Sequence, residues 1–409
     1  MRSLALFALL AAGTVLAVPV QAEPLKIGII ESLSGSQTST GRLFAAAVDY
    51  GVSLINAEGG FNGAPVQVIK YDNAGGTTEA ADKFKQAVAD RVNIIVQGAS
   101  SAIAGQITED VRKYNLRNPG KEVMYINVGA EAMELTGDKC HFYQFRYTTT
   151  APMRVNALVK AMKAAGDLGT KVYSINQNYS WGTDMQAAIE AAAPIGGYEV
   201  VEKVLHDVNK IQDFAPYVAK IKAANPDTAI TGNWSNDVLL LMKAAHDAGL
   251  KVRFATAFLD QPGNIANAGE IALGDYLANS YVNGAGDPTF AEKYKAAVGH
   301  YPVFVEPQTV FAIGALQLAL AKLDFHGGPI NVTDIAKALE NVTYMSPVGP
   351  ISVRKEDHQT IRPVVVSKVV KNPKYPADGT DLGFQAVSTV AGPDAIYPVQ
   401  ASCQMKRPT

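Results

Sequence analysis

Apolar segments of strand length alternate with segments of helical periodicity along most of this chain. The first such series has strands predicted at 25–30, 66–72, 92–96 and 123–127, and helices at 42–57 and 77–91. Strands that alternate with helices pair in parallel and are covered by helices on both faces of the sheet. The alternation therefore predicts an α/β protein.

A second series of the same kind begins near residue 151. Its predicted helices are 152–165, 182–193, 214–224 and 237–248, and its predicted strands are 171–175, 199–204, 227–231 and 253–256. The two series share an architecture without a repeated sequence. Because 409 residues are many for a single core, we expect two Rossmann-like lobes, each built on a parallel central sheet.

The remaining part of the chain does not begin a third domain. It contains helices predicted at 289–298 and 310–323, a helix starting at 331–334, strands at 350–353 and 361–367, and a tail rich in Pro, Gly and Asp. The two helices after residue 289 are expected to return to the first lobe.

Residues 1–22 have the organisation of a secretory signal peptide. Arg2 supplies a positive charge, residues 4–20 are mostly apolar, and Val20 and Ala22 are small residues at the positions that a signal peptidase reads. We expect cleavage after Ala22 and export to the periplasm as a soluble protein. The apolar stretch is short for a membrane-spanning helix. The expected cleavage site has no cysteine to which a lipid could be attached, so we do not expect a lipoprotein anchor.

The overall charge and composition exclude several kinds of partner. Hydrophobic residues make up 48% of the chain and charged residues 18%, which is typical of a globular protein. The net charge of −2 offers no basic surplus for nucleic acid or for an anionic membrane surface.

The chain has two cysteines, Cys140 and Cys403. In an oxidising compartment such a pair predicts one disulfide, which would tie the middle of the chain to its tail. The alternative is two free thiols that are simply buried.

Motifs for catalysis, cofactors and metals are missing from the sequence. It contains no Gly-x-Ser-x-Gly elbow, Walker loop, Gly-x-Gly-x-x-Gly or His-Glu-x-x-His, and its six histidines are scattered without ligand spacing. We therefore expect a binding protein that is not an enzyme and that uses no cofactor or metal.

The turn at residues 96–105 is the strongest candidate for a binding site. A buried strand ends at Val96, small residues including Ser100 and Ser101 follow, and a helix continues from Gln106. The N–H groups at a helix start have no partner within the helix, and the helix dipole is positive there, so such a turn can hold a carboxylate. The alternative is that these serines only cap the helix.

Several motifs resemble the periplasmic solute-binding proteins of branched-chain amino acid ABC transporters, the Leu/Ile/Val-binding family. The matching residues are Leu33-Ser34-Gly35, the stretch Ile55-Asn56-Ala57-Glu58-Gly59-Gly60-Phe61-Asn62-Gly63, Tyr71-Asp72, Glu134-Leu135-Thr136 and Trp181-Gly182. The resemblance covers nearly all of residues 26–370. It implies a type I periplasmic binding protein fold, in which a hinge closes two lobes over the solute, and a membrane permease as partner. Proteins of this architecture work as monomers.

The resemblance also implies how the chain divides. Three segments are expected to cross between the lobes, near residues 147–151, 279–284 and 349–354. Lobe 1 would then contain residues 23–148 and 284–350, and lobe 2 residues 149–283 and 351–409.

The family's ligand contacts can be transferred to matching positions here. The serine that takes the ligand carboxylate falls on Ser100, and the two aromatic walls fall on the tryptophans Trp181 and Trp234, which otherwise would be core residues as readily as a ligand wall. The loop on the neighbouring strand falls on Gly129, Ala130 and Glu131. We expect the solute to bind lobe 1 through Ser100 and the N–H groups around Ala130.

Two departures from the family leave the solute open. The acidic residue that holds the ligand ammonium falls on Phe258, with Asp260 two residues further on, while Glu131 replaces a threonine. Either Glu131 or Asp260 supplies the charge, or the ligand has no ammonium, because an apolar position cannot offset a buried charge. A hydrophobic amino acid and an aromatic carboxylate remain alternatives, as do a soluble ligand sensor and an exported hydrolase with an unfamiliar nucleophile.

Overall fold

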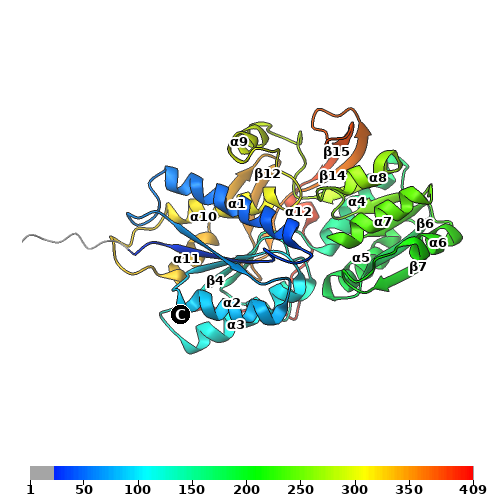
Figure 1. Ribbon diagram of the computed structural model, residues 1–409. Coiled ribbons are helices and arrows are strands. Elements are labelled where there is room, and N and C mark those ends of the chain that lie inside the picture. The colour runs from blue at the N-terminus through cyan, green and yellow to red at the C-terminus, as the bar shows by residue number, and fades with distance from the viewer. Residues whose placement is uncertain (1–22, 409) are drawn as a thin grey trace, which may run out of the picture.

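The computed structural model describes residues 23–408 and has two α/β lobes side by side (Figure 1). The predicted signal peptide lies outside the described residues. The first lobe contains a five-stranded parallel sheet of order β2-β1-β3-β4-β5. Its strands are β1 (Lys26–Glu31), β2 (Gln67–Asp72), β3 (Ile94–Gln97), β4 (Met124–Asn127) and β5 (Gln144–Arg146). The predicted parallel α/β architecture is thus confirmed, with β5 as an additional edge strand.

Helices from both ends of the chain cover this first sheet. They are α1 (Thr38–Ala57), α2 (Thr77–Ala89), α3 (Ser101–Arg117), α9 (Thr289–Val298), α10 (Glu306–Leu320) and α11 (Val332–Leu339), with the short 3₁₀ helix η1 (Met133–Thr136). Helix α1 packs against α10, and the Cβ position of Gly51 lies against Ile313. Helix α10 is apolar on most sides and is almost wholly buried, as is expected of a helix packed on several faces.

The second lobe contains a seven-stranded mixed sheet of order β15-β14-β10-β9-β8-β6-β7. Its strands are β6 (Lys171–Gln177), β7 (Glu199–His206), β8 (Thr228–Thr231), β9 (Arg253–Thr256), β10 (Tyr276–Asn279), β14 (Val364–Lys371) and β15 (Leu382–Val390). Strand β14 pairs antiparallel with β10 and β15. Neither β10 nor β15 is predicted from the sequence, and β15 lies in the tail expected to be irregular.

Helices of the second lobe follow the predicted order. They are α4 (Ala151–Ala165), α5 (Ser180–Gly196), α6 (Ala215–Ala224), α7 (Asn236–Asp247) and α8 (Asn264–Ala268), with the 3₁₀ helix η2 (Gly269–Ala272). None of the helices within residues 23–408 is both long and apolar enough to cross a membrane.

Segments near the end of the chain return to the first lobe. Strands β11 (Thr343–Ser346), β12 (Gly349–Val353) and β13 (Thr360–Ile361) form a separate small sheet beside α10, and Gln359 bridges to Arg146 at the end of β5. After the short helix α12 (Gly392–Ala395) the tail reaches Cys403, which is bonded to Cys140. The predicted disulfide is confirmed.

These contacts bear on the predicted lobe boundaries, which stay a prediction. Strand β12 pairs with β11 and β13 pairs with β12, rather than with the second sheet, and the tail is bonded beside η1. We propose that the third crossing lies at residues 362–363, between β13 and β14, and that the tail after β15 belongs with lobe 1 instead of lobe 2.

Candidate functional site

A small cavity of about 30 Å³ lies between the two lobes, at the carboxyl ends of their parallel strands. Ligands of open parallel sheets bind at this end of the strands. The lining residues predicted from the sequence are Ser100, Ser101, Gly129, Ala130, Glu131, Trp181, Trp234 and Phe258. The other lining residues were not named as ligand contacts from the sequence, although Gly98 and Ala99 belong to the predicted turn at residues 96–105. They are Thr40, Phe44, Gly98, Ala99, Tyr179, Phe304 and Val305. The structure therefore brings together eight of the nine predicted ligand-binding residues.

Ser100 lines the cavity, and its side chain does not cap the helix that follows it. It immediately precedes α3 and has a φ of 71°, in the left-handed region that non-glycine residues seldom adopt. Its hydroxyl makes no capping hydrogen bond to α3. The first-turn N–H groups of α3 have no partner within the helix. A carboxylate at this point would meet both the hydroxyl and those N–H groups.

Ser101 has a different role from Ser100. Its Oγ accepts a hydrogen bond from the backbone N–H of Ala132, over 3.2 Å, and its side chain is buried. Ser101 therefore joins the turn before α3 to the loop that follows β4, and both segments line the cavity.

A buried carboxylate lies beneath this turn. Glu31, at the end of β1, accepts the backbone N–H groups of Gly98 and Ala99 at Oε1, over 2.5 and 3.3 Å. Its Oε2 is buried without a hydrogen-bond partner. Burial raises the pKa of Glu31 to about 8, although three backbone hydrogen bonds oppose the rise. The carboxyl group orients the turn and engages two of its N–H groups, which are therefore not free to bind a solute.

The loop after β4 is held in a similar way. The side-chain oxygen of Asn127 accepts the N–H groups of Gly129 and Ala130, over 3.1 and 2.8 Å. These two amides, expected to donate to the solute, are therefore already engaged. The amide of Glu131 has no protein acceptor within the described residues, so it is the one amide in this loop that a solute could use.

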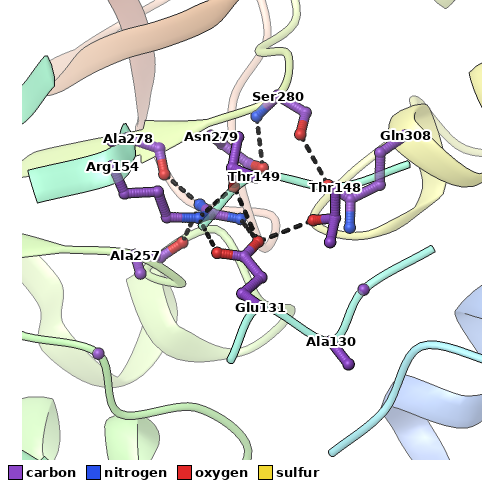
Figure 2. A network of polar contacts seen from close by, with 12 residues as sticks. Ala130, Glu131, Thr148, Thr149, Arg154, Ala257, Ala278, Asn279, Ser280 and Gln308 are labelled. Atoms are coloured by element: carbon purple, nitrogen blue, oxygen red, sulfur yellow. Dashed lines mark hydrogen bonds and ion pairs between the residues drawn. The ribbon is translucent and has the colours of Figure 1, made fainter. Parts of the chain in front are cut away.

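Glu131 belongs to a buried network that joins the lobes (Figure 2). Its Oε1 accepts hydrogen bonds from Thr148, Thr149 and Nη2 of Arg154, over 2.8, 2.9 and 2.6 Å. Its Oε2 accepts one, from Nε of Arg154, over 2.8 Å. Arg154 also reaches the carbonyl groups of Ala257 and Ala278 in the second lobe. Most of the hydrogen-bonding capacity of Glu131 is thus used within the protein, and Oε2 is the oxygen that can accept a further hydrogen bond.

Aromatic rings from the second lobe form one wall of the cavity. Trp181 donates its Nε1–H to the carbonyl of Gly232 over 2.8 Å, and Trp234 donates to the hydroxyl of Tyr179 over 2.6 Å. Both tryptophans are buried, Trp181 in the first turn of α5 and Trp234 in the loop between β8 and α7. Since each indole N–H is satisfied within its lobe, the rings are held in place as apolar surfaces.

Phe258 extends this wall toward the first lobe. Its ring lies 5.5 Å from that of Trp181 and 5.6 Å from that of Phe304, between centroids. The guanidinium carbon of Arg154 lies 4.8 Å from the Phe258 centroid. The side chain at the position expected to hold an ammonium therefore packs against rings and a cation.

Asp260 does not line the cavity. It borders a separate groove of about 520 Å³, on the other side of Phe304. Its Oδ2 accepts a hydrogen bond from Asn279 over 2.5 Å, and its Oδ1 is buried without a partner. Burial raises the pKa of Asp260 to about 6. Of the two acidic residues proposed to pair with an ammonium, Glu131 alone contacts this cavity.

Thr40 supplies a polar group that the sequence did not single out. It lies in the first turn of α1 and is 2% exposed. Its hydroxyl is buried and has no hydrogen-bond partner, while its side chain lines the cavity. A buried hydroxyl without a partner is unfavourable, so a ligand atom bound there would satisfy it.

No group of three potential metal ligands is found within residues 23–408. Around the cavity the polar groups are hydroxyls, amides and one ion-paired carboxylate.

Comparisons with known proteins agree with this geometry. A sequence profile described as periplasmic binding protein matches residues 24–379. The chain is 57% identical over 395 residues to Leu/Ile/Val-binding protein homolog 4 of Brucella abortus. The aligned region covers 96% of this chain and 95% of that protein.

Solved structures share the fold. A Brucella ovis crystal structure described as a leucine-, isoleucine-, valine-, threonine- and alanine-binding protein in its closed conformation is 57% identical, with a TM-score of 0.90, and covers 95% of this chain and 100% of that one. A solute-binding protein of an ABC transporter from R. palustris, in complex with benzoate, has a TM-score of 0.75 at 18% identity, covering 90% and 98% of the two chains. At that identity the similarity concerns the fold alone.

Proposed function

Because this chain belongs to the periplasmic binding protein family and therefore binds a solute, we propose that its solute is a small aliphatic amino acid. The observation that carries the proposal is the small cavity between the lobes. It combines a serine at a helix start whose hydroxyl makes no capping hydrogen bond with one carboxylate and an aromatic wall.

The carboxylate of the amino acid binds at the start of α3. Ser100 donates its hydroxyl hydrogen, and the first-turn N–H groups of α3 donate as well. The amide of Glu131 and the hydroxyl of Thr40 are further donors that have no protein partner. Charge-assisted hydrogen bonds of this kind are stronger than neutral ones.

The ammonium group binds near Glu131. Glu131 is the single acidic residue among those that line the cavity, and its Oε2 accepts one hydrogen bond within the protein. The ion pair with Arg154 fixes the position of the carboxylate, and Oε2 has room for a further donor from the ligand.

The side chain of the amino acid packs against the rings of Phe44, Trp181, Phe258 and Phe304. A cavity of about 30 Å³ is much smaller than the roughly 150 Å³ that accommodates benzene in a protein core. A small aliphatic side chain therefore requires less movement of the walls than an aromatic ring. The amino acids named for the Brucella ovis protein fit this preference.

An aromatic carboxylate remains the second candidate. The aromatic wall and the replacement of an acidic residue by Phe258 favour it, since rings stack on rings. For such a ligand the ion pair of Glu131 with Arg154 would serve only to join the lobes.

Delivery follows binding. The protein works as a monomer in the periplasm and presents its closed form to the membrane permease of an ABC importer, without altering the solute chemically. Closure is a hinge motion stabilised by contacts that exist only in the closed state.

Calorimetric titration of the mature protein tests the proposal. Alanine, threonine, valine and leucine should bind, and benzoate should bind at least tenfold more weakly than the best of them. Tighter binding of benzoate than of every amino acid would replace the first candidate by the second. Recovery of an altered amino acid after incubation would contradict a purely binding role.

A further inference from the structure

A hydrogen bond outside the cavity joins η1 of the first lobe to α5 of the second. The backbone N–H of Met133, at the start of η1 in the first lobe, donates to Oδ2 of Asp184 in α5 of the second lobe, over 2.7 Å. Asp184 has no other hydrogen-bond donor within the described residues, and it is partly buried. The carboxylate therefore serves this contact alone.

Both partners lie next to walls of the cavity. Met133 comes two residues after Glu131, and Asp184 comes three residues after Trp181. Helices α5 and η1 are in contact where the lobes meet. A change in the distance between Met133 and Asp184 therefore changes the distance between the two lining segments.

Hydrogen bonds within the first lobe hold the segment that contains Met133. The carbonyl of Met133 accepts a hydrogen bond from the side chain of Gln400 over 2.7 Å. The carbonyl of Ala132 accepts one from Nη1 of Arg146 over 2.5 Å. Gln400 belongs to the tail, which is bonded nearby through Cys403. Segment 132–133 is thus held to its own lobe on one side, and only its Met133 N–H faces the other lobe.

We propose that Asp184 is a positioning residue that latches the lobes together, forming its bond to Met133 only on closure and so slowing release of the solute. The inference rests on the proposed function, because a latch needs a cleft that opens and closes around a ligand. Asp184 does not line the cavity, so it should affect affinity without affecting which solute is preferred.

The side chain of Asp184 acts as an acceptor for a backbone N–H. Asparagine keeps a carbonyl oxygen at the same distance along the side chain, whereas alanine leaves the Met133 N–H without a partner. A hydrogen bond to a charged group contributes enough free energy for about a tenfold effect on an equilibrium constant. The two substitutions therefore separate the loss of the acceptor from the loss of the charge.

The experiment measures leucine binding and release by the full mature chain. Asp184→Ala should release leucine about tenfold faster and bind it about tenfold more weakly, with association unchanged and the same order of preference among amino acids. Asp184→Asn should stay within about threefold of the wild type. Glu190→Ala is the matched control on the same helix, because Glu190 pairs only with Lys203 of its own lobe, and it should leave binding unchanged.

Two results would overturn the latch. One is an Asp184→Ala variant that releases leucine at the wild-type rate. The other is an equal loss in both Asp184 variants together with a lower melting temperature of the ligand-free protein, which would make Asp184 a folding residue.

Failure of the wild-type protein to bind leucine would overturn the proposed ligand. The latch can then still be tested in the ligand-free protein. Spin labels at Lys113→Cys on α3 and Lys243→Cys on α7 report the distance between the lobes. Asp184→Ala should increase the population at long distance in the ligand-free protein. Identical distance distributions with and without the Asp184→Ala substitution would refute the latch.

Discussion

Glu131 and Arg154 form an ion pair that crosses between the lobes at the edge of the solute cavity, with 2.6 Å between Oε1 and Nη2. Glu131 follows β4 of the first lobe, and Arg154 lies in α4 of the second. Each side chain is 1% exposed. The boundary between the lobes therefore contains a buried pair of charges whose partners come from different lobes. Thr148 and Thr149, which lie between β5 and α4, donate to the same carboxylate.

Breaking this ion pair should strongly destabilise the protein. Arg154→Ala leaves the carboxylate of Glu131 buried without its counter-charge, and we expect the free energy of unfolding to fall by about 3–5 kcal/mol. Urea denaturation measures the change. Lys203→Ala breaks the exposed pair with Glu190 and should cost under about 1 kcal/mol. Equal small losses in both variants would show that the buried pair is not important for stability.

Removing the hydroxyl of Ser100 should weaken amino acid binding. Ser100→Ala loses a hydrogen bond to the ligand carboxylate, which we expect to reduce the binding free energy by about 1–3 kcal/mol. Calorimetry with the preferred amino acid measures the loss. Ser53→Ala is the control, because Ser53 is an exposed residue of α1 that binds only the carbonyl of Tyr50. Unchanged affinity in Ser100→Ala would remove Ser100 from the site.

Replacing Ser100 by glycine should separate binding from stability. The φ of 71° at Ser100 is strained for serine but not for glycine. We expect Ser100→Gly to raise the free energy of unfolding by about 1 kcal/mol relative to Ser100→Ala, while binding stays as weak as in Ser100→Ala. Thermal unfolding of the two ligand-free variants gives the comparison, and an alanine variant as stable as the glycine variant would argue against strain at this position.

Stability should depend on pH through Glu31. Its pKa is about 8 in the folded chain against an ordinary value of 4.5, so between these values the folded chain holds a proton that the unfolded chain lacks. The contribution of Glu31 to stability is present below pH 4.5 and is lost as the pH rises through 8, by at most about 1.4 kcal/mol per pH unit.

Glu31→Gln tests this dependence because its side chain stays neutral. Between about pH 5 and pH 8, the free energy of unfolding should fall less steeply with pH in the variant than in the wild type. Urea denaturation at several pH values measures the two slopes. Glu79→Gln, at an exposed position of α2, should keep the wild-type slope. Parallel curves for Glu31→Gln and the wild type would show that Glu31 titrates normally.

The disulfide should stabilise the tail that braces η1. The double substitution Cys140→Ser and Cys403→Ser opens a loop of 263 residues, and we expect the free energy of unfolding to fall by about 2–5 kcal/mol. Limited proteolysis followed by mass measurement should then detect cleavage after β15, where the wild type resists. A variant with the wild-type unfolding midpoint and an intact tail would contradict a stabilising role for the bond.

Much of the architecture was readable from local patterns. The alternation of apolar strands and amphipathic helices predicted both lobes, because each element must bury one face and its periodicity shows which. Strand ends could be found in the same way, so Ser100, Trp181 and Trp234 were assigned to the edge of the sheets where a ligand binds. Strand β15 was not predicted, because it is a half-exposed strand in a tail rich in turn-forming residues.

The tertiary structure decided what each polar group faces. Glu131 and Asp260 were equal candidates for an ammonium in the sequence, yet one lines the cavity and the other lies beyond Phe304. Arg154, Glu31 and Asn127 were not singled out. Arg154 nevertheless pairs with Glu131, and Glu31 and Asn127 accept four backbone N–H groups of the binding loops. Periodicity reports which way a residue points within its own strand or helix. The partner of a buried charge is brought close by folding. The separation of the two residues along the chain does not indicate that they will be in contact.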